Sequence, residues 1–307
     1  MRQTKEMRLV YRDFLAEEGS KNPQIAVLEA DLSSSMATNQ LSDVLGKRYV
    51  NLGIMEQEMI GVAAGLSLLG YKPYVHTFGP FATRRVYDQL FISLAYAKLN
   101  ATIIGSDAGV SAEMNGGTHM PFEELGLIRL IPQAHLFEVS DDIQFEAILK
   151  ASLDLPGLNY IRTIRKAPFP IYQGDEDFSQ GYCQLQQGSD LSIVASGIMV
   201  EQALKAAALL AEEGLSVQVL DVFRLKPLNP AIKELLLKRP TLTVENHNQI
   251  GGLGSAICEL MAAESDSPVY TMGIRESFGQ VGQMDYLLKA YGLTDKDIYT
   301  KVKSILT

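Results

Sequence analysis

One glutamate, Glu56, stands where a short apolar strand gives way to a helix. Tyr49–Leu52 read as the strand, Gly53 allows the turn, and the helix continues to about Leu66. Ligands of α/β proteins bind at the edge formed by the carboxyl ends of the strands, so a carboxyl group here is a candidate for chemistry. The alternative is a first-turn glutamate that faces water and complements the helix dipole. Position alone leaves both interpretations open.

Two further segments carry polar residues that suit a small anionic ligand. Asp107–His119 is a glycine-rich loop, and such a length without regular structure usually indicates function or mobility. Arg162, Arg165 and Lys166 follow one another closely at the end of an expected strand. A few cations of this kind can hold a phosphate even on an acidic protein.

Composition argues against several classes of function. The 307 residues are 47% hydrophobic and carry a formal net charge of −9 without a run of Lys or Arg, so we expect no nucleic-acid partner. No apolar stretch has membrane-spanning length and the first residues lack the apolar segment of a signal peptide, so we expect no membrane association and a cytoplasmic location. Cys183, Cys258 and the histidines show no metal-binding spacing, and we expect no metal site built by this chain alone.

The elements that must position the candidates alternate between strand and helix. Strands are expected at Ile25–Leu28, Lys72–Phe78, Ala101–Gly105, His135–Val139 and Asn159–Arg162, and helices at Lys5–Glu18, Thr83–Leu99, Glu123–Leu130 and Asp142–Leu153. Gly19 is expected to end the first helix. Repeated βα units predict an α/β fold, a mostly parallel sheet flanked by helices.

A break in this alternation divides the chain in two. Arg165–Gln187 contains Pro168, Pro170 and the polar run Gln173–Asp177. A second alternation follows, with strands at Leu191–Ala195, Ser216–Leu220, Thr241–Glu245 and Val269–Met272 and helices at Val200–Glu213 and Pro230–Lys238. We therefore expect two consecutive domains, residues 1–167 and 188–307, joined by a linker at 168–187.

A glycine-rich turn, Ile250–Gly254, opens a further helix in the second half. Its glycines could cradle a phosphate at the helix N-terminus, or they could serve close packing of a strand against a helix. The sequence contains neither a phosphate-binding loop of the NTPase type nor a dinucleotide fingerprint in the required context.

Four separated motifs resemble the carboxyl-terminal portion of the transketolase family. They are Glu29–Ser35, Asn51–Gln57, Thr77–Phe81 with Tyr87–Gln89, and Gly116–His119, in the family's order. The resemblance covers nearly the whole chain, and it implies a pyrimidine-binding domain followed by a transketolase C-terminal domain. It implies an enzyme of carbohydrate metabolism that transfers a two-carbon ketol unit from a ketose phosphate to an aldose phosphate.

One part of the family has no counterpart here. The diphosphate-binding domain of transketolases carries a Gly-Asp-Gly motif followed by an Asn, and this sequence has no such motif. The resemblance thus implies one subunit of a split transketolase. An N-terminal partner subunit would hold Mg²⁺ and the diphosphate of thiamine diphosphate, in an assembly expected to be an α2β2 heterotetramer.

The resemblance assigns the pyrimidine end of the cofactor to this chain. Glu56 matches the glutamate that hydrogen-bonds the pyrimidine N1′ and exchanges a proton there. Phe81 matches the aromatic residue that stacks on the ring, and Phe78 is the competing candidate. Asp31 matches an acidic residue near the thiazolium cation, for which loop capping is the alternative role.

Other matches concern the sugar. Arg8, Ser35 and Arg165 match positions that hold the sugar phosphate, although Arg8 could instead be a solvated helix residue. His119 matches the histidine beside the reacting carbons and is the second candidate catalytic residue.

Two residues depart from the family pattern where it meets the sugar. Asp107 stands where many transketolases have a histidine for the hydroxyls of the donor, and Asn115 stands where they have an aspartate that contacts the acceptor. Each change alters charge or hydrogen-bonding character. The resulting hypothesis is a non-standard or branched ketose phosphate donor.

Two other interpretations stay open. Half of a deoxyxylulose-phosphate-synthase-like enzyme, or a 2-oxoacid dehydrogenase beta subunit, would share the motif around Glu56. Asp107–Gly109 favours that interpretation, whereas Thr77–Gln89 favours a transketolase. The second interpretation is a non-catalytic partner that only completes a dimer, and the joint presence of Glu56, Phe81 and His119 argues against it.

Overall fold

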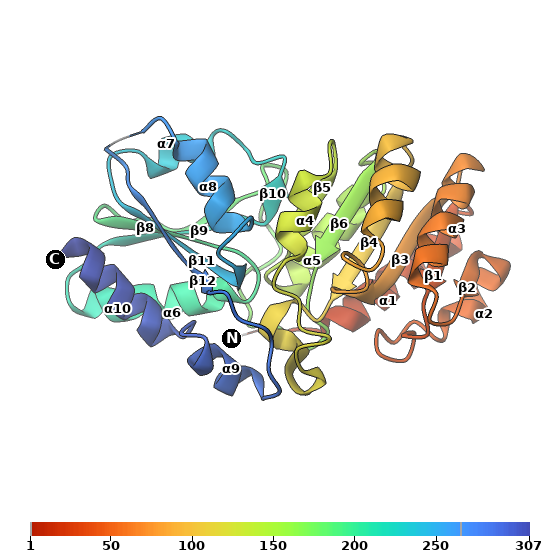
Figure 1. The fold of residues 1–307 in the computed structure, drawn as a ribbon, viewed down its shortest axis with the longest axis horizontal. Helices are drawn as coiled ribbons and strands as arrows, with labels where there is room; N and C mark the ends of the chain where they lie inside the picture. The colour runs from red at the N-terminus through yellow and green to blue at the C-terminus, as the bar shows by residue number, and fades with distance from the viewer. Residues whose placement is uncertain (1, 265) are drawn as a thin grey trace. The chain divides into compact units, whose positions relative to one another are not determined.

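The computed structural model describes residues 2–264 and 266–307, which form two compact units. The described residues of unit 1 are 2–108 and 127–176, and those of unit 2 are 109–126, 177–264 and 266–307. Each unit has its own mostly parallel sheet flanked by helices, which confirms the predicted α/β class (Figure 1). No helix in the described ranges combines the length and apolar character needed to cross a membrane.

The sheet of unit 1 follows the order β5-β6-β4-β3-β1-β2, with every neighbouring pair parallel. Its inner strands are apolar runs whose residues are buried almost throughout, as expected for a sheet covered on both faces. The strands are β1 Ile25–Glu29, β2 Tyr49–Asn51, β3 Lys72–Phe78, β4 Ala101–Ser106, β5 His135–Glu138 and β6 Leu158–Arg162.

Helices cover both faces of this sheet, α1 and α5 on one and α3 and η2 on the other (Figure 1). They are α1 Met7–Lys21, α2 Leu41–Leu45, η1 Gly46–Arg48, α3 Glu56–Leu68, η2 Gln89–Tyr96 and α5 Asp142–Ser152. The prediction that Gly19 ends the first helix is wrong. Gly19 lies inside α1, where an added Cβ would come within 2.5 Å of the Leu45 side chain, so glycine permits close packing there.

The predicted start of the long helix at Thr83 is also wrong. Residues 81–86 form turns, helical structure begins at Tyr87, and η2 is a π-helix. The Thr83 hydroxyl donates to the Gly79 carbonyl at 2.7 Å, and the Arg85 N–H donates to the Pro80 carbonyl at 3.3 Å. A hydroxyl that bonds nearby backbone competes with helix formation, so the chain stays in turns until this segment ends.

Unit 2 has a sheet in the order β12-β11-β8-β9-β7, in which only β7 is antiparallel to its neighbour among the described pairs. Helices α6 and α10 lie on one face and α7 and α8 on the other (Figure 1). The strands are β7 Cys183–Gln186, β8 Leu191–Ala195, β9 Val217–Asp221, β10 Arg224–Lys226, β11 Thr241–Asn248 and β12 Val269–Ile274. The helices are η3 Gly109–Asn115, α6 Met199–Glu212, α7 Ile232–Leu236, α8 Leu253–Met261, α9 Met284–Ala290 and α10 Asp295–Leu306, and α4 Glu124–Leu130 leads back into unit 1.

The glycine-rich turn before α8 holds a carboxylate of the protein itself. Glu245, which is fully buried, accepts hydrogen bonds from the backbone N–H groups of Leu253 at 2.7 Å and Gly254 at 2.9 Å. An added Cβ at Gly252 would lie 1.9 Å from Glu245 Oε2. The glycines therefore allow a strand carboxylate to reach the helix N-terminus, and the packing interpretation of this turn is confirmed.

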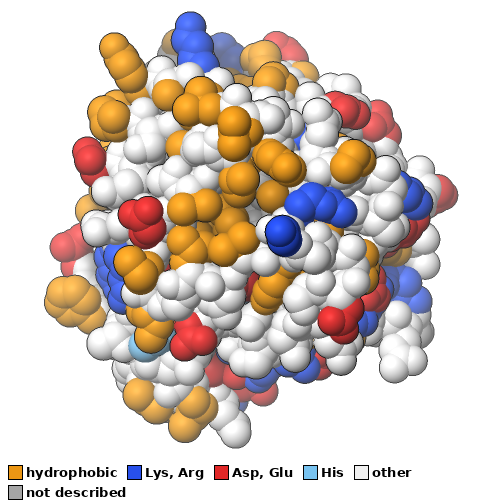
Figure 2. All heavy atoms as spheres, turned by 90° about the vertical axis from the view of Figure 1, so that its right-hand side faces the viewer, with side chains coloured by type: hydrophobic (Ala, Val, Ile, Leu, Met, Phe, Trp, Pro, Cys, Tyr) orange, Lys and Arg blue, Asp and Glu red, His pale blue; other side chains and the backbone are white. Residues whose placement is uncertain are grey.

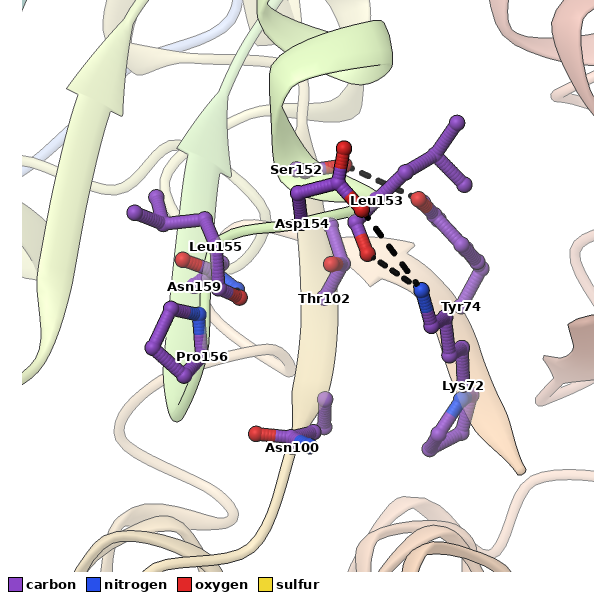
Figure 3. A pocket seen from close by; sticks show the side chains of 12 residues that line it. Lys72, Tyr74, Asn100, Thr102, Ser152, Leu153, Asp154, Leu155, Pro156 and Asn159 are labelled. Atoms are coloured by element: carbon purple, nitrogen blue, oxygen red, sulfur yellow. Dashed lines mark hydrogen bonds and ion pairs between the residues drawn. The ribbon is translucent and has the colours of Figure 1, made fainter. Parts of the chain in front are cut away.

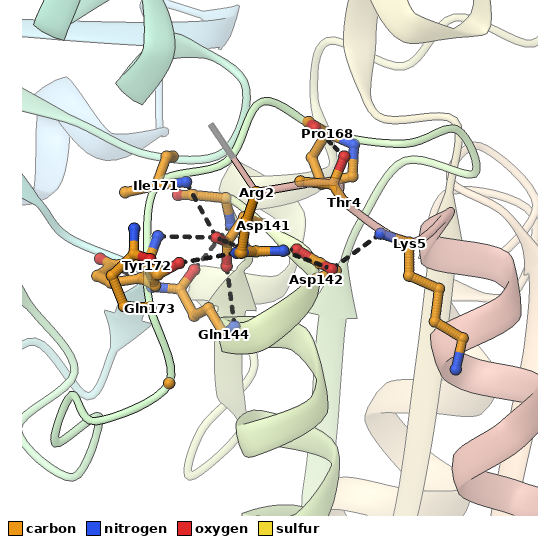
Figure 4. A network of polar contacts seen from close by, with 12 residues as sticks. Arg2, Thr4, Lys5, Asp141, Asp142, Gln144, Pro168, Ile171, Tyr172 and Gln173 are labelled. Carbon is orange, nitrogen blue, oxygen red and sulfur yellow. Dashed lines mark hydrogen bonds and ion pairs between the residues drawn. The ribbon is translucent and has the colours of Figure 1, made fainter.

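An acidic pair anchors the N-terminal segment within unit 1 (Figure 4). Arg2 donates to Asp142 at 2.6 and 2.9 Å and to the buried Asp141 at 2.7 Å. Asp141 also accepts from the backbone of Ile171 and Tyr172, and its Oδ1 caps α5 through the Gln144 N–H. Burial alone would raise the pKa of Asp142, but hydrogen bonds from Arg2 and the Lys5 N–H, together with the Arg2 charge, hold that pKa below its usual value of 3.8.

Arg2→Ala should lower the free energy of unfolding near neutral pH by about 1–3 kcal/mol, because it removes charge-assisted hydrogen bonds to two largely buried carboxylates. The pKa of Asp142 is lower in the folded than in the unfolded chain, so its contribution is present above the usual pKa and is lost as the pH falls through the folded-state pKa. Urea unfolding of both proteins at a series of pH values should show the difference shrinking in acid. Lys21→Ala, which removes an exposed pair with Glu17, is the control; a pH-independent difference for Arg2→Ala would contradict the argument.

Candidate active site

The carboxyl ends of the unit 1 strands gather several candidate residues at one edge of the sheet. The parallel register aligns Glu29 with Asn51 and with His76, Phe78 with Ser106, and Gly105 with Arg162. The candidates that follow or end these strands therefore share one edge: Asp31, Glu56, Phe78, Asp107 and Arg165.

Glu56 is the first residue of α3, and its side chain is only 3% exposed. The alternative of a water-facing glutamate is therefore wrong. Glu56 Oε1 accepts a hydrogen bond from Arg85 Nη1 at 2.6 Å. A buried carboxylate needs such a partner, because burying a charge alone is costly. Sequence analysis missed Arg85, which lies between Phe81 and Tyr87, outside the residues quoted for the motif.

Both candidate phenylalanines lie beside an arginine. The ring centroids of Phe78 and Phe81 are 6.3 Å apart. Phe78 is 7% exposed, and the Arg165 guanidinium carbon lies 5.1 Å from its centroid. Phe81 is half-buried, and the Arg85 guanidinium carbon lies only 3.7 Å from its centroid. Phe81 is therefore the more exposed of the two residues, and the Arg85 guanidinium lies over its ring.

Asp107, Arg165 and Arg8 lie together. Arg165 Nε donates to the buried Asp107 Oδ1 at 2.8 Å, and Asp107 has a positive φ of 60° directly after β4. The Arg8 N–H donates to the Arg165 carbonyl at 3.2 Å, so α1 begins next to this pair. The Arg8 side chain donates to Glu6 at 2.6 Å and is 38% exposed. Arg165 is thus the cation that pairs with the buried Asp107 carboxylate, whereas the Arg8 side chain pairs with Glu6.

Asp31 and Ser35 lie on the loop after β1. Asn51 Oδ1 accepts from the N–H of Asp31 at 3.0 Å and from that of Gly53 at 3.1 Å, so one amide ties this loop to the turn before Glu56. Asp31 is exposed and has a φ of 60°. The Ser35 N–H closes a turn by donating to the Leu32 carbonyl at 3.0 Å.

A buried polar network supports this loop, and sequence analysis missed it. His76 Nδ1 lies 3.0 Å from Glu29 Oε2, its Nε2 lies 3.0 Å from Ser106 Oγ, and the Thr38 hydroxyl donates to Glu29 Oε1 at 2.5 Å. Although Ser, His and Glu recur in hydrolytic triads, Ser106 is fully buried and offers no access to a substrate. The network joins three strand ends to the loop of Asp31. Polar residues inside apolar strands were the available signal.

The loop that carries Asn115 and His119 belongs to unit 2. Asn246 Oδ1 accepts from the Val110 N–H at 2.9 Å, and His247 Nε2 accepts from the Leu125 N–H at 3.2 Å. The buried end of β11 therefore anchors both ends of the loop. Asn115 is exposed, and His119 Nδ1 lies 2.8 Å from the Thr118 hydroxyl.

The opposite edge of the unit 1 sheet contains a pocket of about 200 Å³, at the amino-terminal starts of β3, β4 and β6 (Figure 3). Lys72 fills part of it by donating to the Leu153 carbonyl at 2.6 Å, and Tyr74 bonds Ser152 at 2.9 Å. The residues described as lining it include none of the candidates. Within residues 2–264 and 266–307 no group of three or more metal-ligating side chains is found.

The residues around Glu56 fit the aminopyrimidine that the sequence resemblance implies. A flat hydrogen-bond donor, the Arg85 guanidinium, lies over the Phe81 ring while one edge meets the Glu56 carboxylate. The space between Phe81 and Glu56 can thus hold a planar donor. Ile54 and Met55, immediately before Glu56, are 72% and 55% exposed and leave apolar surface beside it.

Comparison with known families matches both halves of the chain. Residues 3–168 match the profile of "Transketolase, pyrimidine binding domain", and residues 181–298 match that of "Transketolase, C-terminal domain". The segment between them lies inside the linker expected from the sequence; the exact domain limits stay a prediction.

Individual proteins give the same result. The chain is 39% identical to a 6-deoxy-6-sulfo-D-fructose transketolase subunit SqwH of Clostridium sp. (strain MSTE9), over 95% of this chain and 92% of the relative. It is 30% identical to one of the subunits of an apulose-4-phosphate transketolase from Phocaeicola vulgatus, over 95% and 94% of the two chains. A solved structure described as "Split gene transketolase, inactive beta4 tetramer" superposes with a TM-score of 0.88 at 36% identity, covering 99% of this chain and 98% of that one.

Proposed function

Because the chain belongs to the transketolase family, we propose that it is the C-terminal subunit of a two-chain, thiamine-diphosphate-dependent transketolase. The assembled enzyme transfers a two-carbon ketol unit from a ketose phosphate or a related sugar to an aldose phosphate. The observation that carries this proposal is the Glu56 carboxyl, which is buried at the sheet edge within reach of the space above Phe81.

The residues of this chain bind and orient the pyrimidine end of the cofactor. Thiamine diphosphate supplies, when bound, the nucleophilic carbon and the electron sink that cleavage of a ketose requires. Glu56 holds a proton at the pyrimidine N1′, and its burial excludes water from that bond. Phe81 fixes the plane of the ring by stacking, while the more buried Phe78 supports it. By its match to the family, Asp31 would contact the thiazolium side of the cofactor, and His119 would exchange protons with substrate hydroxyls.

In unit 1, the proposed sugar contacts are Arg8, Ser35, Arg165 and the departing residue Asp107. The other residue that departs from the family pattern, Asn115, is proposed by its match in the sequence alone. The pairing of Arg165 with Asp107 supports an unusual donor, because part of the cation's hydrogen-bonding capacity is already used by a carboxylate. The names of two relatives, which mention a sulfonated ketose and apulose 4-phosphate, support the same proposal.

A partner subunit completes the enzyme. It supplies the diphosphate-binding domain and most of the contacts to Mg²⁺, in an α2β2 heterotetramer. Exposed apolar side chains of unit 1 support such an interface, and Figure 2 shows apolar side chains gathered on one face. Among the exposed apolar residues of unit 1 are Ile54, Leu68, Leu69, Ile92 and Tyr96. The cytoplasmic location expected from the sequence stays a prediction.

The two-chain enzyme, reconstituted with its N-terminal partner, provides the test of function. We expect ketol transfer without release of carbon dioxide, and a higher kcat/KM for 6-deoxy-6-sulfofructose or apulose 4-phosphate than for xylulose 5-phosphate. We expect this preference because Asp107 and Asn115 change the hydrogen-bonding groups that the family pattern places at the sugar. Release of carbon dioxide would instead support the deoxyxylulose-phosphate-synthase or 2-oxoacid dehydrogenase alternative. A strong preference for xylulose 5-phosphate would contradict the unusual donor.

A further inference from the structure

Arg85 bridges the two side chains that the proposed function gives to the pyrimidine ring. Its Nη1 lies 2.6 Å from Glu56 Oε1, and its guanidinium carbon lies 3.7 Å from the centroid of Phe81. Gln57 Nε2 donates to the Arg85 carbonyl at 3.1 Å and helps to fix the backbone that carries this side chain. The guanidinium therefore lies over an aromatic ring and donates to a buried carboxylate.

Physical chemistry explains why an arginine suits this position. The Glu56 carboxylate is 3% exposed and requires a counter-charge or a hydrogen-bond donor, while the Arg85 side chain is 39% exposed and can reach in from the surface. A guanidinium satisfies the carboxylate and gains cation–π attraction from the ring at the same time. Because its outer part already meets solvent, it can leave without rearrangement of the sheet.

We propose that Arg85 is a placeholder that occupies the pyrimidine position until the cofactor displaces it. Stacking on Phe81 and a hydrogen bond to Glu56 are the two contacts required of the ring, and both are made here by the guanidinium. The two groups exclude each other. Loading is therefore an exchange, in which Arg85 turns outward as the ring enters. This inference rests on the proposed function.

Such a placeholder lowers the apparent affinity for the cofactor and stabilises the empty chain. If the guanidinium occupies the site nine times in ten, the apparent affinity falls about tenfold. Removing it with Arg85→Gln should therefore tighten binding of thiamine diphosphate to the two-chain complex by about that factor. The same change should lower the Tm of the empty subunit, because Glu56 loses its counter-ion.

Isothermal titration of the assembled wild-type and Arg85→Gln complexes with thiamine diphosphate and Mg²⁺ measures the first effect. Thermal unfolding of the isolated subunit measures the second, and the Tm change should disappear when Glu56→Gln is already present. Arg12→Gln is the matched control, because Arg12 is 32% exposed and also pairs with a carboxylate, Asp13. Its binding should equal that of the wild type.

The outcomes separate the two proposals. If the wild-type complex binds the cofactor but Arg85→Gln binds it equally or more weakly, the placeholder is wrong and the proposed function stands. If the wild-type complex binds no thiamine diphosphate, both are wrong. A Tm change that persists in the Glu56→Gln background would also overturn the placeholder, because the ion pair would not be its cause.

Discussion

Glu56→Gln should reduce kcat of the reconstituted enzyme about 10²- to 10⁴-fold, the range typical of losing a positioned proton-transfer group. Glutamine preserves the shape of the buried side chain at the start of α3. Its amide cannot hold and return the proton at the pyrimidine N1′. Steady-state kinetics at saturating thiamine diphosphate and Mg²⁺ would measure the loss, because saturation separates a catalytic defect from weaker cofactor binding.

Glu58→Gln is the control for this experiment. Glu58 lies in the same first turn of α3, but its side chain is exposed. It should keep kcat within about twofold, as expected of a surface substitution away from the site. Activity of Glu56→Gln within a few-fold of wild type would contradict the catalytic role and would favour the non-catalytic alternative.

Glu138→Ala should lower the free energy of unfolding by about 3–5 kcal/mol, because it leaves the Arg162 guanidinium buried without its carboxylate. Glu138 and Arg162 lie on the neighbouring strands β5 and β6 in register, and Arg162 Nη1 bonds Glu138 Oε1. Arg162 is the largest fully buried side chain among the described residues. Urea unfolding monitored by circular dichroism would measure the change.

The double variant Glu138→Leu/Arg162→Met makes this prediction specific. Replacing both members of a buried pair by apolar residues of similar size is often close to neutral, so most of the lost stability should return. The control is Asp13→Ala, which removes a carboxylate that is 42% exposed and pairs with Lys5 and Arg12. This change should alter the free energy of unfolding little, because exposed ion pairs contribute little. If Glu138→Ala alone unfolds at the wild-type urea concentration, the pair does not stabilise the fold.

Strand positions could be predicted from the sequence because each inner strand is an apolar run, as in Ile25–Leu28 and Ala101–Gly105. Such runs are typical of strands in a sheet that is covered on both faces. Because the strands are parallel, the residues that follow them could be predicted to lie at the same edge of the sheet. Predictions from local sequence were wrong where a residue packs against another that is distant in the sequence. Gly19 contacts Leu45 within a helix that it was expected to end.

The site itself was only partly accessible to sequence reasoning. Motifs of the family singled out Glu56 and Phe81, and a departure from the family pattern singled out Asp107. The structure places all three at the edge of one sheet. Arg85 lies between two quoted motifs, and its orientation toward Glu56 depends on the turns that replace the first part of the expected helix. The contact of His76 with Glu29 is a pairing across strands, which depends on a register that no short stretch of sequence specifies.

Gly109–Gly126 interrupts unit 1 in the sequence but packs with unit 2, where Asn246 and His247 hold its two ends. A chimera that exchanges only the second half of the chain for that of a relative would present this loop with foreign anchoring residues. Successful recombination should require the loop and the distal segment to be inherited together. A crossover point in the linker would therefore separate this loop from the strand residues that anchor it, because the two are far apart in the sequence.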